Sequence, residues 1–319
     1  MNFDFTEEEE AVRELAQQIL DESTSFDRLR EVEADESGPG FDVDLWKALA
    51  EANLIGLPLD EANGGQGFSY LALCLLLEQA GRNLAPVPLL ESVVYTALPI
   101  QQFGNDRLKE TFLPRAATGD LHVAFGVTEP DAGTDTSRVS TRAIEDGDGF
   151  LVRGRKIWST KALESEVCLL LARTDGEPGS LEGLSLFLVD LDPEFCDIAP
   201  IPKLGRNAIA SCEVAYDGLP VEGWRMVGER GRGFRHLLHG LNPERILLAS
   251  MACGLGEAAL RRAAQYAGER EVFERPIGAN QAIAHPLAKA HMELNAALTM
   301  TRLAAWRYDN DLECGEEAN

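Results

Sequence analysis

The chain has 319 residues, of which 45% are apolar, so it is long enough for two or three domains with hydrophobic cores of their own. Its formal net charge is −24, and its basic residues comprise 6 lysines and 23 arginines. Such an acidic surface argues against a nucleic-acid partner and against anionic membranes, because both require basic patches. Dense carboxylates with few lysines suit a protein that works in high salt, which screens their repulsion, so a halophilic source is a hypothesis.

The first 120 residues predict an all-helical domain. Thr6 and Glu9 form a capping box, and the apolar residues that follow recur with a helical period. Segments rich in Gly and Pro separate the later helices. These further helices are predicted over Val43–Ala52, Ser69–Gly81, Leu89–Phe103 and Asp106–Ala117.

Between about residues 121 and 225 the pattern changes to short, alternating or β-branched runs, which predict a small antiparallel β domain. An Asp-Gly turn at Asp146-Gly147 joins two alternating stretches and indicates a β-hairpin over residues 143–152. The Gly-rich segment 228–233 is expected to be a flexible connection out of this domain. The other predicted strands are Glu166–Ala172, Leu184–Asp190, Cys196–Ile201 and Ser211–Tyr216.

Helical patterning then resumes. Asn242 is a good N-cap and Pro243 suits the first helical position, so a helix is predicted to begin there and to reach about Ala267. A second long helix is predicted over Asn280–Asp309. Two long amphipathic helices cannot bury both apolar faces against each other, so we expect downstream residues or a partner chain to complete a bundle.

The cysteines and histidines predict neither disulfides nor a metal site. The six cysteines are scattered without a Cys-x-x-Cys pair and lie mostly in apolar runs, which indicates buried reduced thiols. Gly254-Leu255-Gly256 lies in a helical pattern without a preceding strand, so it is not a dinucleotide fingerprint. No signal-peptide pattern and no apolar run of about 18 residues is present, and we expect a cytoplasmic protein without a membrane span.

Two short segments carry the main functional signal. Val127–Asp135 (VTEPDAGTD) offers hydroxyls and free backbone N–H groups around a Pro-Gly turn, and Lys156–Thr160 (KIWST) offers an aromatic ring and further hydroxyls. The predicted hairpin would bring the two segments side by side. A flat aromatic, hydroxyls and spare amides suit a planar ring rich in heteroatoms, such as a flavin. Taken separately, each segment is as well explained by an ordinary β-turn or a buried Trp.

Together, in this order and spacing, the two segments resemble the flavin-binding signature of the acyl-CoA dehydrogenases. The resemblance covers nearly the whole chain and implies an α+β, mainly α architecture. Its parts would be an N-terminal helical domain (1–120), a central antiparallel β domain (121–225) and a C-terminal helical bundle (226–319) that is incomplete here. Other similar stretches are Asn53–Leu57 with Gly64–Gly67, Leu204–Arg206, Tyr216–Val221, and Arg270–Phe273 with Gln281.

By this resemblance the cofactor is FAD. Thr128 and Thr160 can hydrogen-bond the polar edge of the flavin ring, and Trp158 can pack against it. The resemblance also implies that three residues reach the cofactor of a neighbouring subunit, and hence that the protein is a homo-oligomer, a dimer or a tetramer. The guanidinium of Arg270 suits a pyrophosphate. The alternative for Arg270 is a solvated cation at a helix end without a cofactor contact. The flavin-lining set is Phe125, Val127, Thr128, Gly133, Thr134, Trp158 and Thr160, and the intersubunit set is Arg270, Phe273 and Gln281.

The implied reaction is α,β-dehydrogenation of an acyl-CoA thioester in fatty acid metabolism, with electrons passed to an electron-transferring flavoprotein. A carboxylate removes the α proton. Many family members draw it from a late C-terminal loop, before which this chain ends, whereas a subset places it where Glu244 stands in Asn242-Pro243-Glu244-Arg245. A helix N-terminus there would stabilise the anion, but it would equally favour a capping glutamate. Thr134, Asn242 and Arg245 are the expected substrate contacts.

Two other interpretations stay open. The chain could be a non-catalytic or truncated member of the family that works only with a partner chain, or a flavin oxidase or monooxygenase of the same fold. Bleaching of a yellow protein by acyl-CoA would separate the first of these from an active dehydrogenase. Acyl-chain length and branching cannot be assigned, because the candidate segments around Leu75–Gly81 and Leu89–Thr96 are equally good core residues.

Overall fold

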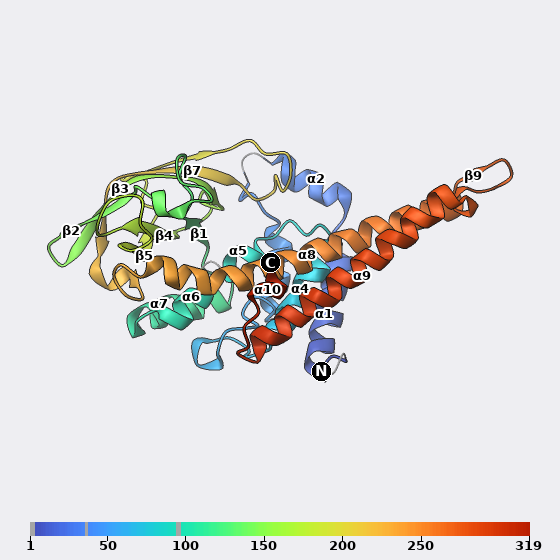
Figure 1. The fold of residues 1–319 in the computed structure, drawn as a ribbon, viewed down its shortest axis with the longest axis horizontal. Coiled ribbons are helices and arrows are strands. Elements are labelled where there is room, and N and C mark those ends of the chain that lie inside the picture. The colour runs from blue at the N-terminus through green and yellow to red at the C-terminus, as the bar shows by residue number, and fades with distance from the viewer. Residues whose placement is uncertain (1–3, 36–37, 94–96) are drawn as a thin grey trace. The chain divides into compact units, whose positions relative to one another are not determined.

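The computed structural model describes residues 4–35, 38–93 and 97–319 (Figure 1). Helices precede and follow a central sheet along the chain, which confirms the predicted α+β, mainly α fold. By their contacts, the residues form two compact units. The domain boundaries expected near residues 120 and 225 stay a prediction. The first unit contains Met1–Ser25, Phe68–Ala85 and Asn242–Asn319, and the second contains Phe26–Gly67 and Pro86–Leu241.

The first unit is mainly helical, and side-chain caps mark the starts of α1 and α4. The predicted capping box is present, since Thr6 Oγ accepts from Glu9 N and the Glu9 carboxylate accepts from Thr6 N. A long-range cap is added at the start of α4, where the carboxylate of Asp309 accepts from the N–H groups of Tyr70 (2.5 Å) and Leu71 (3.0 Å). The helices are α1 (Glu7–Ser23), α4 (Tyr70–Arg82), most of α8 (Gly233–Glu269), α9 (Gln281–Asp309) and α10 (Gly315–Ala318).

Two glycines allow α4 and α8 to approach closely. A Cβ atom on Gly254 would lie 1.9 Å from the carbonyl oxygen of Glu78, and one on Gly81 would lie 1.9 Å from that of Met251. Gly254-Leu255-Gly256 is therefore part of a helix crossing, in agreement with the prediction that it is not a nucleotide-binding loop.

Helix α8 begins at Gly233, so the predicted start at Asn242 is wrong. Pro243 lies inside the helix, where it lacks an N–H for the bond to the preceding turn and its ring crowds the carbonyl four residues earlier. The turns before it are held by burial, because Leu237 is 5% exposed in the apolar cluster of the second unit, against which Phe234 also packs. Long-range packing thus extends the helix past two residues that locally favour an N-terminus.

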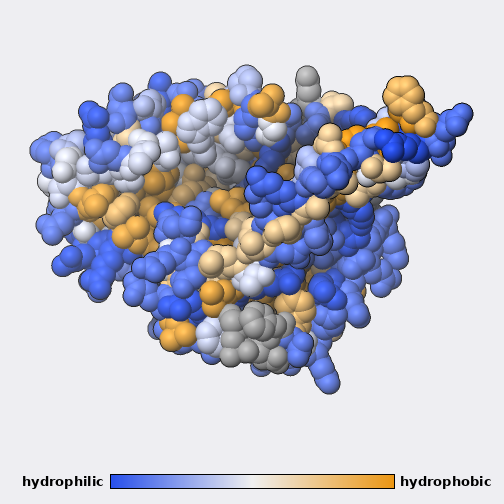
Figure 2. Space-filling view, turned by 45° about the vertical axis from the view of Figure 1, so that its right-hand side comes forward, coloured by the Kyte–Doolittle hydropathy of each residue, from blue (hydrophilic) through white to orange (hydrophobic). Residues whose placement is uncertain are grey.

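The second predicted bundle helix is confirmed as α9, but little of it is buried. Its buried residues are Thr301, Ala304 and Ala305, all in its last third. Met292 is 71% exposed, and apolar side chains are visible between hydrophilic ones along this part of the surface (Figure 2). The described residues therefore leave much of the apolar face of α9 uncovered.

The second unit joins short helices to an eight-stranded sheet. Helix α2 (Phe26–Ala34) was not predicted, and it has no buried residue to give a periodic signal. The predicted helix Leu89–Phe103 is confirmed at its two ends, as α5 and α6. Residues 94–96, which belong to the candidate acyl-pocket segment Leu89–Thr96, lie outside the described residues. The other helices are α3 (Val43–Glu51), α5 (Leu89–Ser92), α6 (Leu98–Phe103), α7 (Asp106–Ala117) and the short η1 (Glu61–Asn63), η3 (Thr136–Arg138) and η4 (Gly223–Arg225).

The strand order of the sheet is β6-β7-β3-β2-β4-β5-β8, with β1 added on β4. The predicted hairpin is confirmed, with Asp146 opposite Gly149 in β2 and β3. The sheet is mixed, because β1 and β2 each pair with β4 in parallel while the other pairs are antiparallel. The strands are β1 (Val123–Gly126), β2 (Arg142–Asp146), β3 (Gly149–Thr160), β4 (Val167–Arg173), β5 (Leu184–Asp190), β6 (Cys196–Pro200), β7 (Ser211–Glu222) and β8 (Met226–Val227).

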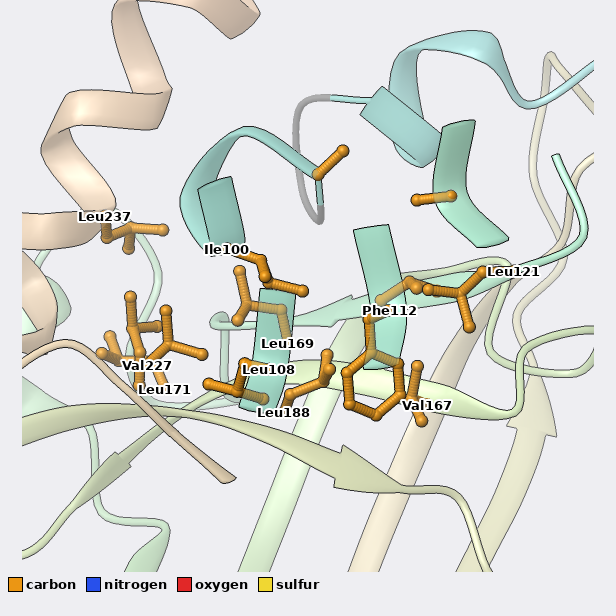
Figure 3. Close-up of a cluster of buried hydrophobic side chains, with 14 of the residues drawn as sticks. Ile100, Leu108, Phe112, Leu121, Val167, Leu169, Leu171, Leu188, Val227 and Leu237 are labelled. Atoms are coloured by element: carbon orange, nitrogen blue, oxygen red, sulfur yellow. The ribbon is translucent and has the colours of Figure 1, made fainter. Parts of the chain in front are cut away.

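Apolar side chains cover both faces of β4. Val167, Leu169 and Leu171 join Leu108 and Phe112 of α7 in one cluster (Figure 3). The alternate residues of β4 belong to a second cluster on the other face of the sheet. Because both faces are covered, all seven residues of β4 are buried, and the strand is a rigid base for its neighbours.

The Gly-rich segment 228–233 is not the loose connection that the sequence suggested. A Cβ atom on Gly233 would lie 2.5 Å from the backbone carbon of Ser185, and Gly231 N donates to Ser185 Oγ at 2.8 Å. Arg230 donates to both carboxylate oxygens of Asp175 at 2.9 Å. The glycines therefore allow a turn that packs tightly against β5.

All six cysteines are free and buried, as predicted. Burial raises the pKa of Cys168 to about 12 and that of Cys196 to about 11, so these thiols stay protonated. Within residues 4–35, 38–93 and 97–319, no group of three or more His, Cys, Asp or Glu residues is arranged to hold a metal ion. In the same residues no helix has the length and apolarity needed to cross a membrane.

Candidate functional site

The structure brings the two motif segments together in the second unit. Ile157 N of β3 donates to the carbonyl oxygen of Thr128 at 2.9 Å. The turn that separates Thr128 from Thr134 is closed by two backbone hydrogen bonds. Glu129 N donates to Ala132 O at 3.0 Å, and Ala132 N donates to Glu129 O at 3.1 Å. The loop 127–135 is thus fixed beside the end of β3, as the hairpin predicted.

A β-bulge directs Trp158 outward. The register of β3 on β7 shifts between Lys156 and Ser159, and Trp158 has a φ of +63°, which is uncommon for an aromatic residue. Its side chain is 53% exposed, whereas Ser159 beside it is buried. A large aromatic ring held at the surface by an unusual backbone conformation is a ready contact for a planar ligand.

Several hydroxyls in the two segments have no partner among the described residues of the protein. In the part of the chain that the structure describes, the hydroxyls of Thr128, Thr134 and Thr160 make no hydrogen bond, and a Cβ atom on Gly133 would meet nothing within 4 Å. The buried hydroxyl of Ser159 is also unpartnered. The threonine hydroxyls are accessible to solvent, so they are available to a ligand with many acceptors and a flat ring, as FAD has. Phe125 and Val127 pack against the apolar cluster beneath.

A buried ion pair lies under this loop. Lys156 Nζ is 2.8 Å from Glu129 Oε1, and neither side chain is more than 3% exposed. Burial lowers the pKa of Lys156 to about 8, partly offset by Glu129. For Glu129, burial raises the pKa, but the charge of Lys156 and hydrogen bonds outweigh it and leave the pKa at about 2. We did not expect this pair, although Lys156 shares the strand phase of the buried Phe150 and Val152.

A second buried amine follows directly after Thr160. Lys161 is 1% exposed, and its Nζ contacts Nδ1 of His122 between the rings of Phe41 and Trp46. Burial lowers the pKa of Lys161 to about 7 and, together with the lysine charge, that of His122 to about 4. Between about pH 4 and pH 7 the pair therefore carries one proton, on Lys161. No sequence motif indicated their contact.

The expected base Glu244 and two of the expected substrate contacts, Asn242 and Arg245, lie in the first unit, whereas Thr134 lies in the second. Glu244 is inside α8, so the argument that a helix N-terminus stabilises its charge does not hold. Arg245 donates to Asn242 Oδ1 at 3.0 Å, one turn away on the same helix. The hydroxyl of Tyr70 donates to the carbonyl oxygen of Pro243 at 2.7 Å. The backbone just before Glu244 is therefore held by α4.

The intersubunit candidates are all exposed and lie where α8 gives way to α9. Arg270 follows the last residue of α8 and accepts a backbone hydrogen bond from Ile277 at 2.8 Å. Phe273 and Glu274 form the turn between β9 (Glu271–Val272) and β10 (Arg275–Pro276), with φ of +54° and +61°. Phe273 is 94% exposed, and Gln281 is the first residue of α9.

Comparison with known proteins gives a consistent result. Models of the N-terminal, middle and C-terminal domains of acyl-CoA dehydrogenases match residues 6–120, 124–219 and 231–319. Acyl-CoA dehydrogenase fadE12 of Mycobacterium bovis is 34% identical over 280 residues, which cover 86% of this chain and 72% of the relative.

Two solved structures are also similar. Butyryl-CoA dehydrogenase from Megasphaera elsdenii has a TM-score of 0.92 at 27% identity, covering 100% of this chain and 84% of the other. A chain in the structure of the electron transferring flavoprotein of Acidaminococcus fermentans has a TM-score of 0.92 at 28% identity, covering 100% and 83%.

Proposed function

Because this chain belongs to the acyl-CoA dehydrogenase family and is an acyl-CoA dehydrogenase with FAD as its cofactor, we propose that it removes hydrogen from the α and β carbons of an acyl-CoA thioester. The observation that carries this proposal is the backbone hydrogen bond from Ile157 to Thr128, which brings the two motif segments together beside the exposed ring of Trp158. The hydroxyls of Thr128, Thr134 and Thr160 in these segments have no partner among the residues that the structure describes. Thr128 and Thr160 would donate to the polar edge of the flavin, and Trp158 would pack against its ring. When bound, FAD accepts the β hydrogen as a hydride.

We propose Glu244 as the base that removes the α proton. The hydrogen bond from Tyr70 to the Pro243 carbonyl supports this role, because it fixes the backbone from which Glu244 projects. Burial, followed by nearby charges that include Glu244, raises the pKa of Tyr70 well above its usual value, so the phenol stays protonated and remains a donor. Arg245, held by Asn242, would bind the substrate, as would Thr134.

The variant Glu244→Gln tests the base. We expect it to retain FAD but to lose most acyl-CoA oxidation, by about 10²–10⁴-fold, the usual contribution of a general base. Glu257→Gln, on the same helix, is the matched control and should keep wild-type activity. Wild-type oxidation by the Glu244→Gln protein would show that another group is the base.

The electron acceptor and assembly state belong to the same proposal. The likeness to a chain in an electron transferring flavoprotein structure supports such a protein as acceptor. The exposure of Arg270, Phe273 and Gln281 supports their contact with the cofactor of another copy, and hence a homo-oligomer. A cytoplasmic location is proposed as well.

The deciding experiment is an anaerobic titration of the FAD-loaded protein with short, medium, long and branched acyl-CoAs. Bleaching of the oxidised flavin by one class, with turnover supported by an electron-transferring flavoprotein, is the expected result. Rapid consumption of oxygen instead would favour an oxidase of the same fold. A protein that binds FAD but bleaches with none of the acyl-CoAs would refute the proposed reaction.

A further inference from the structure

The buried ion pair of Lys156 and Glu129 is hydrogen-bonded to several backbone groups around it. Besides Glu129, Lys156 Nζ donates to the carbonyl oxygen of Val127 at 2.9 Å. The Glu129 carboxylate accepts from Ser140 N at 2.8 Å, from the Ser140 hydroxyl at 2.7 Å and from Thr141 N at 2.9 Å. A buried charge pair is stable only when such additional bonds satisfy its remaining donors and acceptors, and here they link three segments of the chain.

These bonds hold one loop residue on both sides. Val127 and Glu129 are the neighbours of Thr128, and both are bound by the Lys156 ammonium. The carbonyl oxygen of Thr128 accepts from Ile157 N, the residue after Lys156. Three consecutive residues of the loop are thus bound by two consecutive residues of β3, which fixes the backbone that carries the Thr128 side chain.

We propose that Lys156 and Glu129 are positioning residues for FAD, which hold the Thr128 hydroxyl where it donates to the flavin. The inference rests on the assignment of Thr128 to the flavin under the proposed function. Neither charged side chain needs to contact the cofactor, because both act through the loop. Preorganised donors bind a ligand more tightly than mobile ones, because less freedom is lost on binding.

The ammonium is the part of this arrangement that responds to pH. Lys156, with a pKa of about 8, faces Glu129 on the loop and Cys168 on β4, and Arg173 of β4 also senses the charge of Glu129. Cys168 stays neutral because burial raises its pKa to about 12. Above about pH 8 the amine therefore loses its proton and its charge-assisted bonds to the loop weaken. FAD affinity should fall over that range.

The experiment compares FAD binding and apoprotein unfolding in four variants. Lys156→Met removes one partner, Lys156→Met/Glu129→Gln removes both charges, Thr128→Ala removes the proposed flavin donor, and Arg155→Met is the control. Arg155 is the adjacent residue on β3, and its ion pair with Glu213 at 2.9 Å lies at the surface. FAD dissociation constants are measured from flavin fluorescence between pH 6.5 and 9.5, and thermal unfolding is followed without FAD.

The loss of one or two hydrogen bonds to the loop should raise the dissociation constant of Lys156→Met about tenfold or more. Because the double variant leaves no buried unpaired charge, it should recover apoprotein stability without recovering FAD affinity. The pH dependence of binding should be lost in both, and Arg155→Met should match wild type.

Wild-type FAD affinity in the double variant, or the same pH dependence in it, would overturn the proposal. Unchanged FAD affinity in Thr128→Ala would overturn it by a different route, since Thr128 would then not be the flavin donor. Both results are independent of whether the wild-type protein bleaches with acyl-CoA, so a failure of this inference and a failure of the proposed reaction are distinguishable.

Discussion

The substitution Gly254→Ala should destabilise the protein although alanine is the better helix former. The new Cβ atom would lie 1.9 Å from the Glu78 carbonyl oxygen, and since such contacts below 3.0 Å essentially do not occur, α4 and α8 must separate by about 1 Å. Helix propensity favours Ala over Gly by about 1 kcal/mol. Overpacking a tight contact costs about 1–3 kcal/mol or more, and the obstacle here is backbone, which cannot rotate away. We expect a net loss of about 2 kcal/mol.

The assay is thermal unfolding followed by circular dichroism. With an unfolding entropy of about 2.1 cal/mol/K per residue, a loss of about 2 kcal/mol lowers the Tm of this 319-residue chain by about 3 °C. The matched control is Gly268→Ala on the same helix, where a new Cβ atom meets nothing within 4 Å and only the propensity gain remains. A Gly254→Ala protein that melts at or above the wild-type temperature would refute the argument that this glycine is required by the helix crossing.

Three further outcomes are expected. Asp309→Ala should lower the Tm, because the N–H groups of Tyr70 and Leu71 lose their long-range cap, and an unchanged Tm would show that water replaces it. The folded pKa of Lys161, about 7, lies below the ordinary lysine value, so above pH 7 the unfolded state binds more protons than the folded state. The free energy of unfolding should therefore gain a contribution from Lys161 that rises from about pH 7 to 8.5. This rise should be absent in Lys161→Met. Finally, with a net charge of −24, the protein should unfold more readily in about 50 mM than in about 2 M salt, and equal stability would remove the halophilic hypothesis.

Where local chemistry decides the structure, the sequence was a reliable guide. The capping box at Thr6 and the Asp146-Gly147 hairpin need only neighbouring residues, and both are confirmed. The start of α8 depends instead on the burial of Leu237, about which Asn242 and Pro243 carry no information. Local signals therefore fixed the type of most elements but not the limits of this helix.

The candidate site divides in the same way. The exposed Trp158 and the free hydroxyls beside it follow from the motif pair, because ligand contacts are carried by recognisable residue types. The supporting layer was not predicted, because a lysine in an alternating strand is ordinarily placed on the solvent side. Only the phase that Lys156 shares with Val152 pointed inward. The contact of Lys161 with His122 joins residues 39 positions apart and left no pattern to find.

The burial of these two lysines changes what the surface offers to chemical reagents. Of six lysines in the chain, Lys156 and Lys161 are at most 1% exposed, and Lys203 is half-buried with its ammonium bound to backbone carbonyl oxygens. The remaining lysines are Lys47, Lys109 and Lys289. Solvent therefore meets the protein mainly through carboxylates and guanidinium groups. Amine-directed labelling or crosslinking would report on very few places, and carboxylate-directed coupling would be the better way to map contacts with other chains.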